Sequence, residues 1–296
     1  MHIHFGRSNG YIQSIELTQV SHHKALPHIN KLLSENGYSD PIHKIQVENS
    51  VVNNEDYAAL QTIFHQCKAL NEIKLNSNHI DSEHMYELFS ALPGKQLMSI
   101  SFTDNWIGEK IPNNFFEFML TQQSIQFLDF SLNWLGDSGI IKLVDSISHN
   151  VHRLQLSCDD FQVEGLIAIR HFILQCSQLS ELDISYNNLD ANSAKQIAGI
   201  IGESDCISSI KANSNQFGDK GAALIADALK YNDKMINLDV SDNGISNIGA
   251  KDLVKSVSKK AVMRQLDLRH NPINPDEIDQ ITRAMAESHP LIEVLV

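Results

Sequence analysis

Histidine and cysteine are the side chains in this sequence that could bind a metal ion or attack a substrate. The chain has 14 histidines, and several gather near its start (His2, His4, His22, His23 and His28). A metal site needs ligands at fixed spacing, such as two histidines one helical turn apart or paired cysteines. No helical HxxxH pair and no Cys/His spacing of that kind is present. We therefore expect freely titrating surface histidines, no metal ion and no cofactor.

The four cysteines (Cys67, Cys158, Cys176 and Cys206) form no CxxC pair. Cys158 is followed by two aspartates, and nearby negative charge disfavours the thiolate that a nucleophilic cysteine needs. The sequence also lacks GxSxG, GxGxxG, P-loop, HExxH and EF-hand motifs. We therefore predict that the chain is not an enzyme and has no catalytic residue.

Charge narrows the classes of partner. The chain has 296 residues with 36 acidic and 23 basic side chains, and its net charge is −13 at pH 7. This excess repels nucleic acid and anionic membranes, so we expect a protein partner with a basic or mixed basic and apolar surface. No apolar run of about twenty residues and no secretory signal is present, so we expect no membrane insertion and a cytoplasmic, intracellular location.

An internal repeat determines how the side chains are positioned. Residues 179–189 read LSELDISYNNL and residues 125–135 read IQFLDFSLNWL, and both fit LxxLxLxxNxL. The same pattern begins, more loosely at the ends of the chain, at residues 12, 42, 70, 97, 125, 151, 179, 207, 235, 263 and 291. The last five intervals are all 28 residues. The alternating Leu-x-Leu predicts a short strand whose apolar residues face inward.

Asparagine stands at the ninth position of most repeats. Its amide both donates and accepts hydrogen bonds, so it can satisfy the backbone where the chain leaves the strand. We expect these asparagines to stack into a structural ladder, formed by Asn78, Asn105, Asn133, Asn187, Asn215, Asn243 and Asn271.

The second half of each repeat predicts a helix, because its apolar residues change to helical spacing. One strand–helix unit cannot bury its apolar side alone, so neighbouring units must stack. We predict a single domain over residues 1–296, with a hairpin cap and first strand at 1–17, regular repeats at 42–290 and a terminal strand at 291–296. Asn9-Gly10 between two alternating runs indicates the hairpin. No stretch is left for a second, catalytic domain.

These segments, together with GDKGAALIADAL at 218–229, resemble the ribonuclease-inhibitor type of leucine-rich repeat protein. The resemblance covers roughly residues 12–296. It implies an α/β solenoid in the form of a horseshoe, with a concave parallel sheet, convex α-helices and about 28 residues per repeat. It also implies an intracellular protein that binds other proteins. An isolated solenoid of this kind further resembles bacterial leucine-rich repeat effectors, which implies virulence and entry into a host cell without a signal peptide.

Two tryptophans and their neighbours are the first candidate partner-binding residues. Trp106 and Trp134, the only tryptophans, each follow a ladder asparagine in adjacent repeats, about 5 Å apart at the sheet, so we expect the indoles to lie close enough to stack. Phe127, Leu132 and Tyr186 occupy other non-core positions nearby. Clustered aromatic side chains are typical of interaction hot spots. Alternatively, the two tryptophans fold over the ladder and only seal the surface between repeats.

Acidic residues are the second candidates. Asp129 and Asp183 occupy an outward strand position, and Asp104 and Asp242 follow an outward position in their repeats. We expect these carboxylates to steer a basic partner by long-range attraction. For Asp129 and Asp183 a structural alternative stays open, because Leu-Asp-x-Ser belongs to the common pattern of the repeat. Asp104 and Asp242 do not belong to that pattern.

The sequence therefore predicts a protein–protein interaction module that binds its partner on the concave face. The alternative is a regulator of a small GTPase, because Ran GTPase-activating proteins have similar repeats, although this chain lacks their long acidic tail. A further partner contact is expected at the strand edge Leu291–Val296, where we expect Ile292 and Leu295 to be exposed.

Overall fold

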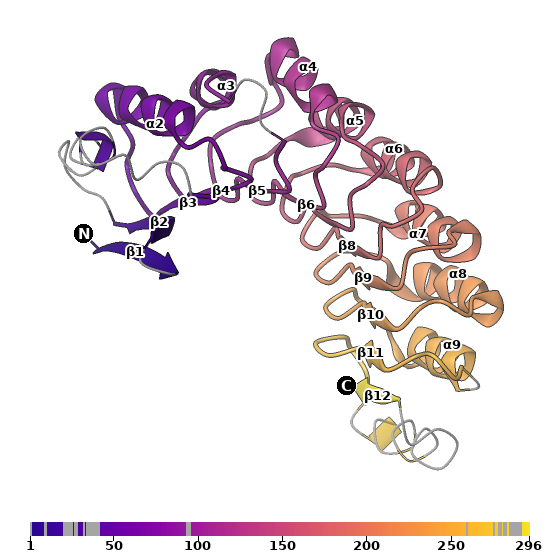
Figure 1. The fold of residues 1–296 in the computed structure, drawn as a ribbon. Coiled ribbons are helices and arrows are strands. Elements are labelled where there is room, and N and C mark those ends of the chain that lie inside the picture. Colours follow the sequence, from indigo (N-terminus) through magenta and orange to yellow (C-terminus); the bar gives the residue numbers. More distant parts are fainter. Residues whose placement is uncertain are drawn as a thin grey trace. The chain divides into compact units, whose positions relative to one another are not determined.

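The structure is a computed structural model and describes residues 2–8, 11–19, 26, 29–31, 33, 42–92, 96–258, 260–274, 276–277, 280, 283 and 292–296. Strands and helices alternate along the chain (Figure 1). The strands are β1 His2–Ser8, β2 Tyr11–Thr18, β3 Lys44–Glu48, β4 Glu72–Asn76, β5 Ser99–Ser101, β6 Phe127–Asp129, β7 Arg153–Gln155, β8 Glu181–Asp183, β9 Ser209–Lys211, β10 Asn237–Asp239, β11 Gln265–Asp267 and β12 Glu293–Leu295. The helices are α2 Asn54–Gln66, α3 Ser82–Ser90, α4 Asn113–Thr121, α5 Gly136–Ser146, α6 Val163–Ile173, α7 Ala191–Glu203, α8 Gly218–Tyr231 and α9 Asn247–Val257.

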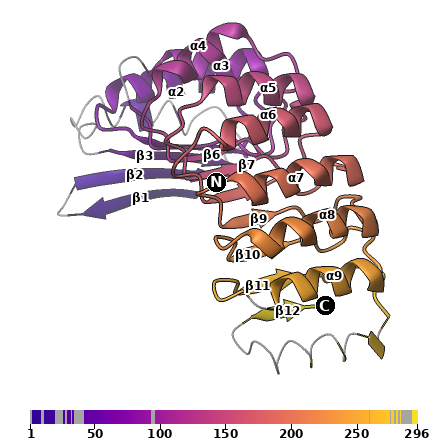
Figure 2. The same ribbon diagram turned by 90° about the vertical axis from the view of Figure 1, so that its right-hand side faces the viewer.

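The chain divides into two compact units. The first contains residues 1–134 and 146–151, and the second contains residues 135–145 and 152–296. Within each unit the strands follow one another in sequence order, β1 to β6 in the first and β7 to β12 in the second. The helices cover one face of the strands, and in the second unit α7, α8 and α9 lie side by side (Figure 2). We call the face of the strands turned away from the helices the open face.

The strands pair in parallel with apolar residue opposite apolar residue. Ile45 pairs with Ile73 and Ile73 with Ile100 in the first unit, and Leu182 pairs with Ile210 in the second. All five residues are at most 2% exposed. A shift of one residue would turn the whole apolar set toward solvent, so burial on one face determines the register.

The helices are amphipathic, and each buries one stripe of its side chains. In α8, for example, Ala222, Ile225, Ala226 and Leu229 are buried at helical spacing. Several helices begin at a side-chain cap. Asn53 accepts from the backbone N–H groups of Glu55 and Asp56, while the Asp56 carboxylate accepts from the Asn53 N–H, which forms a capping box.

The seven repeat asparagines connect each repeat to its neighbours in the same unit. The Asn187 side-chain amide donates to the Leu156 carbonyl of the preceding repeat at 2.9 Å. The Asn187 backbone N–H donates to Oδ1 of Asn215 in the following repeat at 3.1 Å. The same donation from the amide to a carbonyl of the preceding repeat occurs at all seven positions, Asn78, Asn105, Asn133, Asn187, Asn215, Asn243 and Asn271. Each asparagine therefore satisfies backbone groups that would otherwise be buried without a partner.

Two aspartates brace adjacent helices of the second unit. Asp137 Oδ1 accepts from the backbone N–H of Gly165 at 2.7 Å, at the start of the next helix. Asp219 Oδ1 likewise accepts hydrogen bonds from the backbone N–H groups of Gly249 at 3.0 Å and Ser246 at 2.8 Å. A Cβ at Gly165 or Gly249 would lie 2.8 or 2.7 Å from the bracing carboxylate oxygen. Glycine at these helix starts therefore makes room for the carboxylate of the preceding repeat.

The two ends of the chain differ in how they agree with the sequence. The predicted hairpin is present, because β1 pairs antiparallel with β2 from His2↔Thr18 to Ser8↔Tyr11; its turn residues Asn9 and Gly10 lie outside the described residues. At the other end β12 pairs in parallel with β11. The expectation that Ile292 is exposed is wrong, because its side chain is 8% exposed and Leu295 is half-buried; Leu291 is not among the described residues. The prediction of one domain with regular repeats over 42–290 stays a prediction.

Replacing one ladder asparagine should destabilise the fold. We expect Asn215→Ala to lower the free energy of unfolding by about 3 kcal/mol, since it leaves buried backbone groups of two repeats without partners. Asn114→Ala, the same change at an exposed position of α4, should alter it by less than about 0.5 kcal/mol. Urea denaturation of both variants tests this, and equal effects would show that the ladder adds no stability.

The Asp219 brace should make stability depend on pH. Hydrogen bonds from the Ser246 hydroxyl and from the backbone N–H groups of Ser246 and Gly249 lower the pKa of Asp219 below 3.8. The stabilisation is therefore present above the unfolded pKa and is lost as pH falls through the lower folded pKa. We expect Asp219→Asn to be less stable than the parent by about 1 kcal/mol at pH 7. This difference should narrow below about pH 4. Asp205→Asn, at an exposed position, is the control in the same urea titrations, and a difference that stays constant down to pH 3 would contradict the brace.

Candidate partner-binding surface

A sharp turn follows each strand, and it carries four of the predicted site residues. Asp104, Leu132, Tyr186 and Asp242 have left-handed backbone angles, with φ between 49° and 63°. The strands end before these residues, at Ser101, Asp129, Asp183 and Asp239. The turn lets the ladder asparagine that follows each of these four residues point inward, while the side chains of the four residues themselves point to solvent. Leu132 is 41% exposed and Tyr186 is 59% exposed.

The two aspartates in the strands make local hydrogen bonds. Asp129 Oδ1 accepts from the backbone N–H of Ser131 at 3.0 Å. Asp183 Oδ1 accepts from both the backbone N–H and the hydroxyl of Ser185, at 3.0 and 2.7 Å. Both aspartates are half-buried. Their carboxylates therefore support the turn and present only part of their surface to a partner.

Asp104 and Asp242 differ from these strand aspartates because their side chains are exposed. Each lies at the tip of its turn, where only the backbone is engaged: the Asp104 N–H donates to the Ser131 carbonyl, and the Asp242 N–H donates to the Arg269 carbonyl, both at 2.9 Å. Their carboxylates therefore extend into solvent, where they can attract a basic side chain.

The two tryptophans are exposed but do not stack on each other. Trp106 is 55% exposed and Trp134 is 57% exposed. Trp106 stacks on His79 with ring centroids 4.4 Å apart and an angle of 8° between the rings. No ring contact joins the two indoles within the described part of the chain, so the expected tryptophan stack is wrong. The exposure also argues against side chains that are folded down to seal the ladder.

Sequence reasoning missed two neighbours of the tryptophans. Val51 and His79 occupy the same position of their repeats, directly after Ser50 and Asn78, and both are exposed, Val51 by 66%. Together Val51, His79, Trp106 and Trp134 form what we call the apolar ridge, one residue from each of four successive repeats of the first unit. The common offset after the ladder position was a signal that could have found them.

In the second unit the residues at the same repeat position do not extend the row of large side chains that forms the apolar ridge. Asp160, Asn188, Gln216 and Gly244 follow its ladder positions and are exposed polar or small residues. Tyr186 is a large exposed side chain on a turn of this unit, one residue before the ladder. Phe127, the remaining aromatic candidate, lies in β6 of the first unit and is half-buried.

Charges on the open face of β2 to β4 are paired among themselves. Lys44 lies between Glu16 and Glu72, with Nζ–Oε1 distances of 3.7 and 3.4 Å. Lys74 lies 3.7 Å from Glu48. The two lysines neutralise most of the charge of the three glutamates, which leaves the apolar ridge and Asp104 as the more distinctive features of the first unit.

Candidate metal ligands are not clustered among the described residues. These residues include no cluster of three or more His, Cys, Asp or Glu that could hold a metal ion. Burial, with a smaller contribution from Cys206, raises the pKa of the Cys176 thiol to about 12, which disfavours its reactive thiolate. No helix in the described ranges is both long and apolar enough to cross a bilayer.

Comparison with known proteins identifies the repeats. A family model described as "Leucine Rich repeat" matches residues 121–144, 175–198 and 231–254. The mouse ribonuclease inhibitor is 21% identical over 90% of this chain and 66% of its own length, and the pig ribonuclease inhibitor gives the same identity and coverage. Three segments of the chain thus match leucine-rich repeats, and the chain as a whole is similar to the ribonuclease inhibitors. The predicted α/β leucine-rich repeat solenoid is thereby confirmed.

Other relatives match shorter parts of the chain or the fold alone. RAN GTPase-activating protein 2 of Arabidopsis thaliana is 25% identical over 45% of this chain and 25% of its own length. A chain in the crystal structure of the Rad7 and Elc1 complex in yeast has a TM-score of 0.53 and 13% identity, over 94% of this chain and 75% of that one. The chain thus spans about two thirds of the ribonuclease inhibitors and a quarter of the GTPase-activating protein.

Because the ridge holds both tryptophans, fluorescence reports directly on it. We expect acrylamide to quench each of the single-tryptophan variants, Trp106→Phe and Trp134→Phe, nearly as strongly as it quenches a free tryptophan amide. His79→Ala should increase quenching of Trp106 and leave Trp134 unchanged, since only Trp106 stacks on that ring. Weak quenching of both variants would contradict the exposed ridge.

Proposed function

We propose that the chain is a non-enzymatic protein-interaction module whose apolar ridge, with Leu132, binds a partner protein. The observation that carries this is the exposure of large apolar side chains in successive repeats, at 55% and 57% for the two tryptophans. Exposing such surface is unfavourable unless another molecule covers it. Tryptophan is also enriched among the residues that dominate binding energies.

Leucine-rich repeat proteins are protein-interaction modules, and the similar ribonuclease inhibitors support the same role here. Asp104 stands two residues before Trp106 and is exposed, so it suits a partner that is basic beside its apolar contact. In the second unit Tyr186 offers an exposed aromatic ring, and Asp242 offers an exposed carboxylate two repeats further along the chain. We assign Phe127, Asp129 and Asp183 to the margin of these contacts, because all three are half-buried.

A photo-crosslinking experiment tests the proposal at single residues. A photoreactive phenylalanine analogue at Trp134 should form a covalent complex with the partner from cell lysate, and the same analogue at Leu120, a 55% exposed position on α4, should not. Affinity for the identified partner should fall at least tenfold with Trp106→Ala/Trp134→Ala, a loss of about 1.4 kcal/mol or more of binding free energy. The free energy of unfolding of this variant should equal that of the parent. Equal yields at Trp134 and Leu120 would refute a specific surface.

The alternative function is regulation of a small GTPase, which the similarity to RAN GTPase-activating protein 2 favours. Such a regulator would accelerate GTP hydrolysis by a GTPase, whereas a simple binding module would not. Single-turnover hydrolysis by Ran and other small GTPases, with and without this chain, separates the two functions. An acceleration that survives Trp106→Ala/Trp134→Ala would favour the regulator and place its site away from the ridge.

Three further predictions from the sequence are part of this proposal and rest on the sequence alone. They are action as a bacterial virulence effector in the cytoplasm of a host cell, entry into that cell without a signal peptide, and a partner contact at the strand edge 291–296. The edge contact has less apolar surface to offer than expected, because Ile292 is buried.

A further inference from the structure

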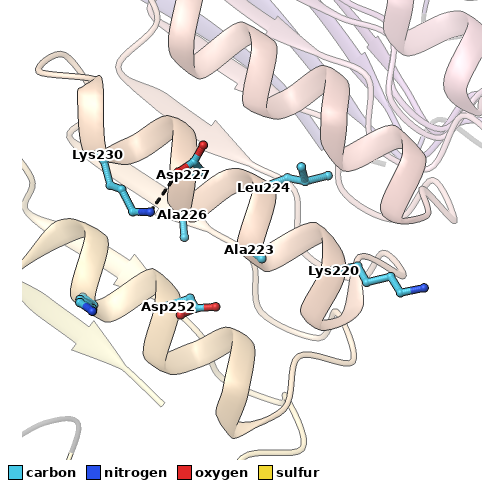
Figure 3. Close-up of a pocket in the computed structure, with 8 residues that line it drawn as sticks. Lys220, Ala223, Leu224, Ala226, Asp227, Lys230 and Asp252 are labelled. Carbon is cyan, nitrogen blue, oxygen red and sulfur yellow. Dashed lines mark hydrogen bonds and ion pairs between the residues drawn. The ribbon is translucent and has the colours of Figure 1, made fainter.

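A groove lies between α8 and α9 of the second unit, on the helical side of the repeats (Figure 3). It has a volume of about 640 Å³. Ala223, Leu224 and Ala226 give it an apolar wall, and charged residues surround that wall. The charged residues are Lys220, Asp227 and Lys230 from α8, and Asp252 and Lys255 from α9.

The polar side chains of the groove are exposed and charged. Lys230 Nζ lies 3.0 Å from Asp227 Oδ1, the ion pair drawn in Figure 3, and Asp252 comes from α9 on the other side of the groove. The hydrogen bond and charge of Asp227, together with the more distant Asp252, raise the pKa of Lys230. The two aspartates do not balance the three lysines, so the groove has a net positive charge.

The surrounding surface has the same sign. Residues 220–264 contain eight of the 23 lysine and arginine residues but five of the 36 acidic residues. Two of those five, Asp239 and Asp242, lie in or just after β10, on the strand side. Further cations on this segment are exposed as well, at Lys234, Lys251 and Arg264. The helices α8 and α9 themselves contain four lysines and three aspartates, and Lys251 is paired with Glu277, so their surface has a small excess of positive charge in a chain whose net charge is −13.

We propose that this groove docks an acidic amphipathic segment of a partner protein. Apolar side chains of the segment pack on Ala223, Leu224 and Ala226, while its carboxylates pair with the surrounding lysines. A helix that lays its apolar face into a groove is a common recognition mode. The surface is separate in sequence and chemistry from the apolar ridge, so this inference does not depend on the proposed function.

Three observations favour an acidic protein segment over a phosphate-rich ligand. Asp227 and Asp252 stand among the lysines, so a uniform polyanion would meet repulsion within the groove. The cations lining the groove are lysines, whereas arginine is the side chain whose planar fork matches phosphate oxygens. The apolar wall suits side chains that enter a hollow rather than the flat surface of a vesicle.

The probe is a labelled synthetic helix of about 18 residues, with leucine at i, i+3, i+4 and i+7 and glutamate on its other faces. We expect the full chain to bind it, measured by fluorescence anisotropy. Lys220→Glu/Lys230→Glu/Lys255→Glu should weaken binding at least tenfold. The matched control Lys68→Glu/Lys110→Glu/Lys195→Glu reverses three other exposed lysines and should bind as the parent does. Circular dichroism verifies that both variants fold.

Several outcomes would overturn the proposal. They are absence of binding at 100 μM peptide, equal weakening by both triple variants, and equal affinity for a peptide with serine in place of leucine. Tighter binding of single-stranded RNA or anionic vesicles, lost in the groove variant alone, would instead assign the surface to phosphates. Trp106→Ala/Trp134→Ala should leave the peptide affinity unchanged, so failure here and failure of the apolar ridge are distinguishable.

Discussion

The hydrogen bonds of the ladder asparagines are the constraint on which the rest of the molecule depends. Each side-chain amide satisfies a carbonyl of the preceding repeat, and at several positions its oxygen accepts the N–H of the preceding ladder residue, as Asn105 does for Asn78 at 3.1 Å. Because an unpaired buried backbone group is costly, the turn after each strand keeps one geometry from repeat to repeat. The left-handed residue before the ladder and the solvent-facing residue after it follow from that geometry.

A constant turn separates structural from functional positions. Residues on the inward side are nearly invariant in character, since all must bury apolar surface or bond to backbone groups. The side chains of residues directly after the ladder position need not bury apolar surface or bond to backbone groups of the core. They therefore differ widely, from Val51 and Trp134 in the first unit to Asn188 and Gly244 in the second. Differences in chemistry between repeats therefore concentrate where a partner can reach them, which is why the proposed binding surface lies there.

The charged side chains also divide into those with a local structural role and those free to attract a partner. Many carboxylates of this acidic chain bond to groups close by. Asp129 and Asp183 accept hydrogen bonds in turns, and Asp137 and Asp219 accept them from the starts of neighbouring helices. Glutamates on the open face of β2 to β4 pair with lysines. Net charge is therefore a poor guide to what a given surface attracts. Asp104 and Asp242 remain exposed carboxylates on the strand side, while α8 and α9 expose lysines on the helical side, so the two sides favour partners of opposite charge.

The sequence by itself determined the strand–helix alternation, the register of the repeats, the column of asparagines and the repeat positions of Trp106, Trp134, Leu132 and Tyr186, whereas the exposure of the two tryptophans was decided by the structure. A fixed period makes this possible, because residues one repeat apart meet the same neighbours again and again. Tertiary structure alone decided the rest. The stack of Trp106 on His79, the burial of Ile292, the use of Asp183 in a turn and the groove beside Lys230 depend on side-chain conformations and on how neighbouring elements pack. These are individual contacts rather than repeated ones, so no period in the sequence records them.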